Sequence, residues 1–409
     1  MGPGPGDAGL VSRAHLTLLW LVSCGPSPSG GDESGSDGSD AGNTEAVPTT
    51  GATSTGETSD ALPEPLDQIP GFKEVFLVQS ARAAVVADFD GDGNLDIFHQ
   101  DILPHAPGDP IQRRGAALLG DGLGGFPGMG PPLVASFPNW DLDIIAGRFT
   151  VEDMVPDLLA TGSLAIAAGD GLGGFLAPSG PPGFGAGRIA IDFDNDGDDD
   201  LIAGSFGYVL FNDGTSYRDG PGFEYFACYH IGFTAIDLDG DPWRDIAVID
   251  SCNAVPDALP IAAYRNLGGT ALELVWQASA GSLETHLLRA ADLTGDGLED
   301  LIMPDHAGIL VFPSRGDGSF DAPETFGTPS KYNPYNLMPI RLDTDAHADL
   351  VVTTGFAVLL IDGATRTVQT IPTGRDVFAA GDLNGDGRDD LVVQRVEYPF
   401  SLGVWLSQP

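Results

Sequence analysis

The sequence predicts an all-β protein that folds as a seven-bladed β-propeller of short antiparallel strands. Three observations favour this fold. The 409 residues include 57 Gly and 32 Pro, a composition that suits many short elements joined by turns better than long helices. An acidic loop of one pattern recurs along the chain, and apolar runs of strand length flank it. The resulting units of 41 to 60 residues hold three to four strands each, which is the period of a propeller blade.

The recurring loop follows the pattern D-x-[DNT]-x-D-G-x-x-D and then Leu or Ile. A weaker copy begins at Arg341, where the first acid is missing, and a further unit is due at Arg148, where most of the pattern is lost. Together with the five fuller copies these make seven units. The fuller copies begin at Asp88, Asp192, Asp237, Asp292 and Asp382.

The acidic side chains of each loop repel one another, so the loop is unfavourable unless water or a cation relieves the repulsion. Ca²⁺ takes about 6 to 8 oxygen ligands, and acids at positions 1, 3 and 5 of a loop that turns at Gly resemble the start of an EF-hand. Position 9 supplies the last carboxylate, which makes the loop shorter and suits a β-hairpin. Mg²⁺ would require stricter octahedral geometry. The loops therefore predict calcium sites, with solvated turns as the alternative.

The loops and their spacing resemble the FG-GAP, or VCBS-type, repeats of bacterial extracellular proteins and of the integrin α-subunit propeller, over residues 70–409. The resemblance implies Ca²⁺-binding loops between the first two strands of most blades, with about five ions in all. It also implies side-chain ligands at loop positions 1, 3, 5 and 9 and a backbone carbonyl ligand at position 7. The implied ligands are Asp88, Asp90, Asp92, Asn94 and Asp96; Asp192, Asp194, Asp196, Asp198 and Asp200; Asp237, Asp239, Asp241, Trp243 and Asp245; Asp292, Thr294, Asp296, Leu298 and Asp300; and Asp382, Asn384, Asp386, Arg388 and Asp390.

The N-terminus predicts export. An apolar run, Leu16–Val22, follows Arg13 and is too short to span a bilayer, so it fits the h-region of a signal peptide. The sequence Leu-Val-Ser-Cys that ends at Cys24 resembles a bacterial lipobox, in which the Cys is lipidated and becomes the mature N-terminus. We therefore expect a lipoprotein-type signal peptide at 1–24 and a protein anchored to the outer membrane or cell surface. A plain signal peptide with an incidental Cys is the alternative.

The following segment, 25–68, is rich in Gly, Ser, Thr, Pro and acids and has few large apolar side chains. Such a segment cannot bury enough surface to offset the entropy lost when it is ordered. We expect a disordered acidic tether that holds the propeller domain, 69–409, away from the membrane to which the lipid attaches it.

The charge of the chain restricts its partners. Its 18 basic and 59 acidic residues give a formal net charge of −41, which disfavours nucleic acid and anionic membrane surfaces as partners. We expect contact with a membrane only through the N-terminal lipid, a monomeric protein, and an unknown protein or glycan as the ligand.

No catalytic motif stands out, because the predicted folded region lacks G-x-S-x-G and H-E-x-x-H, and the 7 His show no spacing typical of a transition-metal site. Two copies of GDGLGG match a dinucleotide-binding pattern, but no amphipathic helix follows either copy. We therefore predict no enzyme and favour a calcium-stabilised binding, adhesion or scaffold module. A glycan-binding lectin or polysaccharide-processing enzyme is one alternative, and a purely structural surface protein is another.

Two cysteines flank the loop that begins at Asp237. If Ile236 pairs with Ile246 across this loop, Cys228 and Cys252 are about diagonal neighbours on antiparallel strands, which places a disulfide within reach. Two buried free thiols are the alternative.

The end of the chain predicts how the ring closes. Residues 401–409 supply a third strand for the last unit but no fourth, and Phe72–Val78 is a strand without a loop of its own. We expect these two segments to pair, because the pairing would leave no long sheet edge open.

Overall fold

The computed structural model describes the chain from Ile69 to Gln408 with gaps. The predicted signal peptide, the predicted tether, Cys24, Cys228 and Cys252 lie outside the described residues, so lipidation and the disulfide stay predictions. The described ranges are 69–79, 81–103, 112–136, 144–150, 155–160, 165–179, 187–203, 208–214, 216–223, 230–250, 259–280, 287–305, 308–326, 334–373, 375–395 and 401–408.

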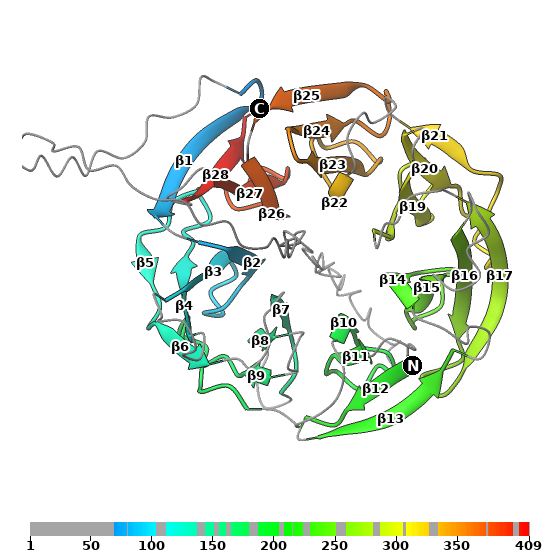
Figure 1. The fold of residues 1–409 in the computed structure, drawn as a ribbon, viewed down its shortest axis with the longest axis horizontal. Coiled ribbons are helices and arrows are strands. Elements are labelled where there is room, and N and C mark those ends of the chain that lie inside the picture. Colours follow the sequence, from blue (N-terminus) through cyan, green and yellow to red (C-terminus); the bar gives the residue numbers. More distant parts are fainter. Residues whose placement is uncertain are drawn as a thin grey trace, which may run out of the picture.

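Seven small antiparallel sheets stand around a ring, and each sheet is one blade of a β-propeller (Figure 1). This arrangement confirms the predicted fold class and the predicted number of blades. The elements of the described ranges are all strands. Within those ranges, no helix is long and apolar enough to cross a membrane.

Blades 1 to 3 are formed by the consecutive strands β2 to β13. Blade 1 comprises β2 (Ala83–Ala87), β3 (Asp96–Ile102), β4 (Gln112–Leu119) and β5 (Gly128–Met129), and β6 (Leu133–Ser136) also pairs with β4. Blade 2 comprises β7 (Ile144–Gly147), β8 (Asp157–Ala160) and β9 (Ala165–Ala167). Blade 3 comprises β10 (Gly187–Ile191), β11 (Asp200–Ala203), β12 (Tyr208–Asn212) and β13 (Tyr217–Gly222).

The remaining blades have four strands each. Blade 4 comprises β14 (His230–Ile236), β15 (Asp245–Asp250), β16 (Leu259–Asn266) and β17 (Leu272–Ala280). Blade 5 comprises β18 (Arg289–Ala291), β19 (Asp300–Asp305), β20 (Gly308–Phe312) and β21 (Glu324–Phe326). Blade 6 comprises β22 (Pro334–Ile340), β23 (Asp349–Thr354), β24 (Ala357–Ile361) and β25 (Val368–Pro372). Blade 7 comprises β26 (Arg375–Gly381), β27 (Asp390–Arg395), β28 (Ser401–Ser407) and β1 (Phe72–Gln79).

The ring closes through β1, as the sequence predicts. This strand pairs antiparallel with β28, with Phe72 opposite Ser407 and Gln79 opposite Ser401. Figure 1 shows β1, in blue, on the outer edge of the last blade beside the red β28. An ion pair between the buried side chains of Arg375 and Glu74 also joins β26 to β1. The pairing of the first and last strands of the propeller therefore closes the ring.

The core lies between consecutive blades, and β15 shows how it is built. Ile246 and Val248 pack in the cluster shared with blade 3, whereas Ala247 and Ile249 pack in the cluster shared with blade 5. Successive side chains of a strand point to opposite faces, so a strand with a blade on each side must be apolar at every position. Burial of a Val, Leu, Ile or Phe side chain contributes about 1.5 to 3 kcal/mol. This explains the continuous apolar runs after each loop.

The strand register around the loop at Asp237 differs from the expected one by one residue. Ile236 lies opposite Asp245 and not opposite Ile246. The last acid of the loop is therefore the first residue of β15, and the second strand of every other blade also begins at such an Asp. The acid belongs both to the loop and to the sheet.

Candidate metal-binding loops

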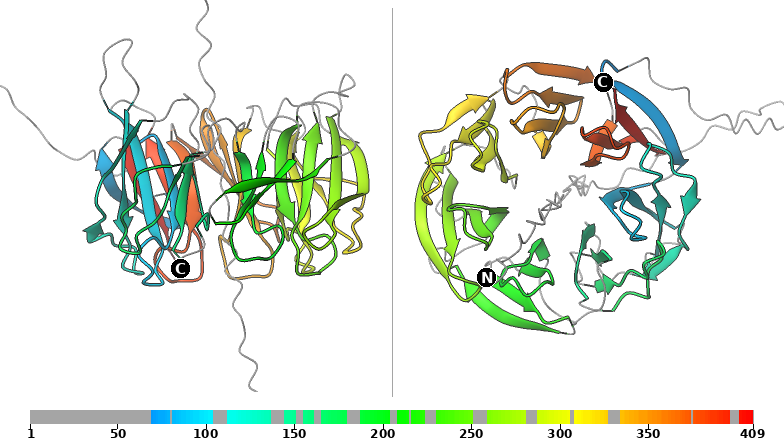
Figure 2. Two further views of the ribbon diagram at one scale, coloured as in Figure 1. Left: turned by 90° about the horizontal axis from the view of Figure 1, so that it is seen from below. Right: turned by 180° about the vertical axis from the view of Figure 1, so that it is seen from behind.

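Seven hairpin loops join the innermost strand of each blade to the second strand. All blades have the same strand order from the centre outwards, so these loops emerge on one face of the disc, which Figure 2 shows edge-on. Positions are counted from 1 to 9, starting at the first acid. Every predicted ligand lies on one of five acidic loops, 88–96, 192–200, 237–245, 292–300 and 382–390, whereas the two arginine loops are 148–157 and 341–349.

The Asp that ends each loop fastens the hairpin in all seven blades. In blade 1, Asp96 Oδ2 accepts a hydrogen bond from the backbone N–H of Phe89 (2.8 Å) and Oδ1 accepts one from Gly120 at the end of the third strand (2.7 Å). These carboxylates are buried in every blade. The two matching bonds are made by Asp157, Asp200, Asp245, Asp300, Asp349 and Asp390.

The Asp at position 1 shapes the turn itself. Asp88 Oδ1 accepts hydrogen bonds from the backbone N–H groups of Gly91 (2.8 Å) and Asp92 (3.2 Å), and its Oδ2 accepts one from Gly93 (2.9 Å). Gly91 and Gly93 have φ of 74° and 93°, a region that only glycine adopts readily. Asp292 and Asp382 make the same three bonds in their loops.

Position 7 contributes through its backbone, which explains why its side chain varies. Its N–H donates to the carboxylate at position 5 in every acidic loop, for example from Asn94 to Asp92 at 2.8 Å. The side chains of Trp243 and Leu298 offer no oxygen at all, so only their carbonyls could bind a hard cation. The expected carbonyl ligand is compatible with this geometry.

Three acidic loops bring carboxylates close enough to share one ion. In each, three Asp residues offer one oxygen apiece within 4.8 Å of the other two. Ligand oxygens at about 2.3 to 2.6 Å from one Ca²⁺ are separated by distances up to about 5 Å. An all-oxygen donor set of this kind fits a hard divalent cation. The groups are Asp88, Asp90 and Asp96; Asp192, Asp194 and Asp196; and Asp237, Asp239 and Asp245.

Burial makes the ionised loops unfavourable on their own. It raises the pKa of Asp96, Asp245 and Asp390 to about 6 each and the pKa of Asp200 to about 7. The hydrogen bonds from backbone N–H groups oppose this shift, and neighbouring carboxylates of the same loop add to it. A cation in the loop would relieve both causes of the rise.

The arginine loops carry a positive group where the acidic loops have their first carboxylate. Arg341 donates to Asp389 twice, from its backbone N–H (2.9 Å) and from guanidinium Nη2 (3.0 Å). The backbone N–H of Asp389 donates back to the Arg341 carbonyl (2.8 Å). Arg148 makes the matching backbone bonds with Asp199, and its guanidinium lies 3.7 Å from the Asp192 carboxylate. The partner in each case belongs to the next blade.

Position 8 of a loop thus contacts the preceding blade, a role that was not predicted. Asp199 and Asp389 are buried there, and Glu299 accepts a hydrogen bond from the backbone N–H of Asp237 (2.8 Å) while it pairs with Arg244 (2.8 Å). One signal in the sequence could have revealed the position. Both arginine loops are followed, in the next loop, by an Asp at position 8.

The Gly-rich turns after the third strands cover the loops of the preceding blades. The backbone N–H of Gly173 in blade 2 donates to the Phe89 carbonyl of blade 1 (3.2 Å), and that of Gly318 in blade 5 donates to the Leu238 carbonyl of blade 4 (3.1 Å). Added to the alternating apolar contacts, these bonds fix each loop between two blades.

Residues 292–352 match the FG-GAP-like repeat family, a span that begins with the acidic loop of blade 5 and ends in β23 of blade 6. The match and the seven-bladed ring agree with the resemblance found in the loops. The protein is a seven-bladed β-propeller that contains an FG-GAP-like repeat. No curated protein sequence matches this chain.

Three solved structures match this chain at low sequence identity. An Agrocybe aegerita lectin, described as recognising non-reducing terminal N-acetylglucosamine, is 18% identical, with 76% of this chain and 88% of that chain covered and a TM-score of 0.51. The biofilm matrix protein Bap1 of V. cholerae is 12% identical, with 80% and 77% covered and a TM-score of 0.42. The Photorhabdus luminescens Tc holotoxin pore is 14% identical, with 76% and 17% covered and a TM-score of 0.39. At 18% identity, the comparison with the lectin shows a shared fold alone.

Proposed function

We propose that this protein is a calcium-binding propeller that acts as a binding, adhesion or scaffold module outside the cell. The observation that carries the calcium proposal is the convergence of three carboxylate oxygens within 4.8 Å in the loops of blades 1, 3 and 4. The loops of blades 5 and 7 have the same backbone hydrogen bonds at positions 1 and 9 and are proposed to bind ions as well.

The ions would stabilise the face of the ring from which the loops emerge. Each loop is fastened to two blades, so an ion that fixes the loop also fixes the seam between them. A cation that binds only the folded state stabilises it by about 2.7 kcal/mol per site when its free concentration is 100 times its dissociation constant. A rigid face of this kind suits a module that binds a protein or a glycan.

Calcium analysis of the purified protein tests this proposal. We expect about five ions per chain, a melting temperature that falls when a chelator is added, and recovery with Ca²⁺ that exceeds recovery with Mg²⁺. The proposal fails if the protein contains no bound calcium and a chelator leaves its melting temperature unchanged near neutral pH.

The lipobox-like sequence supports the further proposal that the propeller is anchored to a membrane through Cys24. Replacing Cys24 with Ser should move the protein from the membrane fraction to the soluble fraction. Wild-type protein that is already soluble, with no acyl chain by mass spectrometry, would contradict the anchor.

A glycan is the second candidate ligand, because the lectin of similar fold recognises a terminal sugar. Aromatic side chains gathered on one face would favour it, but the exposed large apolar side chains of the described residues include one aromatic, Phe356. A glycan array with and without calcium decides between the candidates. Calcium-dependent binding to a defined sugar would establish a lectin, and a blank array would favour a protein ligand.

A further inference from the structure

The acidic loop of blade 3, 192–200, differs from the other four in the state of its carboxylates. Four of its carboxylate oxygens are buried without a hydrogen-bond donor, namely Oδ1 of Asp192, Oδ1 of Asp194 and both oxygens of Asp198. No other acidic loop in the described part of the chain has a buried carboxylate oxygen in this state. This loop therefore has more uncompensated carboxylate oxygens than the other four acidic loops.

Asp198 is the unusual member of the group. Asp198 is only 1% exposed. It occupies position 7, where the other acidic loops have Asn, Trp, Leu or Arg. In blade 1, the amide of Asn94 at this position donates to Asp92 (3.0 Å) and so has a partner. A carboxylate cannot donate in this way, and burying it without compensation is costly.

The nearby cationic side chains do not supply the missing partner. Arg148 lies 3.7 Å from Oδ2 of Asp192, and Arg218 lies 3.4 Å from Oδ2 of Asp194, so both approach oxygens other than the orphaned ones. The hydroxyl of Tyr217 is also buried without a partner.

A proton and a cation are the two ways to compensate these oxygens. One proton on Asp198 serves one oxygen and leaves three without a partner. A divalent cation contacts several oxygens at once and neutralises more charge. The count of orphaned oxygens therefore favours the cation.

We propose that the side-chain carboxylate of Asp198 is itself a cation ligand, so that the loop of blade 3 binds calcium with five carboxylates. The other acidic loops offer four or three at the same positions. Affinity of oxygen sites rises with the number of charged ligands, so blade 3 has the tightest site of the ring. This inference rests on the proposed function, that the acidic loops bind calcium.

Calcium titration of the chelator-treated protein tests it with a matched pair of variants. Asp198→Asn should weaken the tightest site at least tenfold or abolish it, whereas Asp219→Asn, at an exposed carboxylate on β13 of the same blade, should change no site. Asp192→Ala serves as the positive control, because it removes the first ligand of the same loop and should cost one ion. Adding Asp198→Asn to Asp192→Ala should cause no further loss.

Thermal melting at pH 8 separates a ligand from a merely structural residue. In chelator, Asp198→Asn should melt at a higher temperature than the wild type, since it removes a buried carboxylate without a partner. In saturating Ca²⁺ it should melt at a lower temperature. A residue that only supports the loop would lower the melting temperature in both conditions.

The outcomes distinguish this inference from the proposed function. Wild-type protein that binds no calcium would overturn both. If the wild type binds calcium and Asp192→Ala loses one ion, but Asp198→Asn keeps the ion count and the affinity of the tightest site, the proposed function stands and the role of Asp198 is overturned.

Discussion

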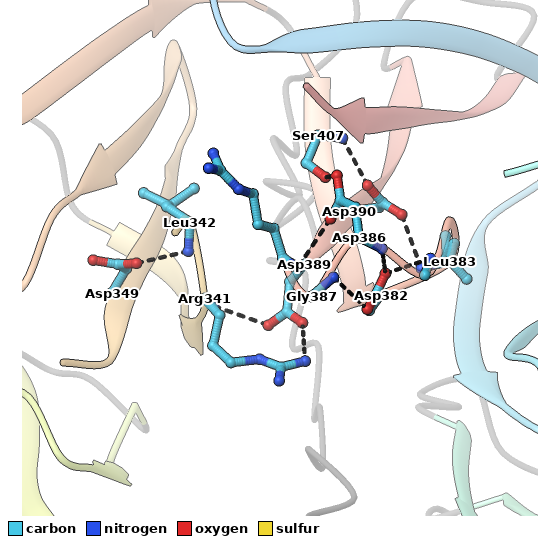
Figure 3. A network of polar contacts seen from close by, with 12 residues as sticks. Arg341, Leu342, Asp349, Asp382, Leu383, Asp386, Gly387, Asp389, Asp390 and Ser407 are labelled. Atoms are coloured by element: carbon cyan, nitrogen blue, oxygen red, sulfur yellow. Dashed lines mark hydrogen bonds and ion pairs between the residues drawn. The ribbon is translucent and has the colours of Figure 1, made fainter. Parts of the chain in front are cut away.

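The neighbouring loops of blades 6 and 7 have the same hairpin geometry and opposite charge at the first position (Figure 3). In the arginine loop 341–349, Arg341 donates to Asp389 of the next blade. In the acidic loop 382–390, Asp382 instead accepts hydrogen bonds from Gly385, Asp386 and Gly387 of its own turn. Both loops end in a buried Asp that accepts the same two backbone bonds.

The comparison distinguishes the loop residues that the hairpin requires from those that a bound ion would require. Position 9 is an Asp in both loops, so the fold requires it whether or not position 1 is acidic. Positions 1, 3 and 5 hold Arg341, Asp343 and Asp345 in one loop and Asp382, Asn384 and Asp386 in the other. Arg341 compensates the charge of Asp389, whereas no ion pair of the described residues involves Asp382, Asp386 or Asp390. We infer that calcium would compensate these three carboxylates of blade 7.

The largest effect should come from removing the shared Asp. Asp349→Ala and Asp390→Ala each leave two buried or partly buried backbone N–H groups without an acceptor, which should cost about 2 to 4 kcal/mol in the free energy of unfolding. Urea unfolding measures the loss. For Asp349→Ala the loss should be the same with calcium and with chelator. A variant whose free energy of unfolding lies within about 0.5 kcal/mol of the wild-type value would show that this Asp does not stabilise the hairpin.

A smaller effect is expected at the arginine. Arg341→Ala should cost about 1 to 2 kcal/mol, because the guanidinium is half exposed while its partner Asp389 is buried and keeps one backbone donor. Arg341→Asp should cost more in chelator but create a fourth carboxylate in the loop. It should therefore bind one ion more than the wild type by metal analysis, and an unchanged ion count would show that the charge at position 1 does not decide metal binding.

The smallest effect for a single residue is its contribution to the dependence of stability on pH. Asp96, Asp245 and Asp390 have a folded pKa of about 6, above the ordinary 3.8, so the folded state binds protons more tightly than the unfolded state. The free-energy cost of burying these ionised carboxylates is present above pH 6 and is relieved as the pH falls towards 3.8. In chelator, the melting temperature should rise from pH 8 to pH 5, with each of the three carboxyls contributing on the order of 1 kcal/mol. With saturating calcium it should fall, because protons compete for the ligands, and a fall in chelator as well would contradict the assignment.

The architecture could be predicted from the sequence because local features mark each repeat. The acidic loops mark the first hairpin of a blade, and the missing fourth strand at 401–409 implies pairing with β1, which the structure confirms. Long-range contacts were harder to predict. The hydrogen bonds of Asp389 and Asp199 to the preceding blade depend on how two blades meet, and no spacing within one loop reveals them. The presence of Asp157 and Asp349 at the ends of the two arginine loops was the overlooked sign that the last Asp of a loop is structural.

The most direct test of the comparison is the calcium content of two matched variants, Asp382→Ala and Asp345→Ala. Asp382 is the first position of an acidic loop, whereas Asp345 lies in the arginine loop, where its carboxylate accepts hydrogen bonds only within the turn. We expect Asp382→Ala to lose about one ion per chain relative to the wild type and Asp345→Ala to lose none. Equal ion counts in the two variants and the wild type would contradict the claim that the acidic loops, and not the arginine loops, hold calcium.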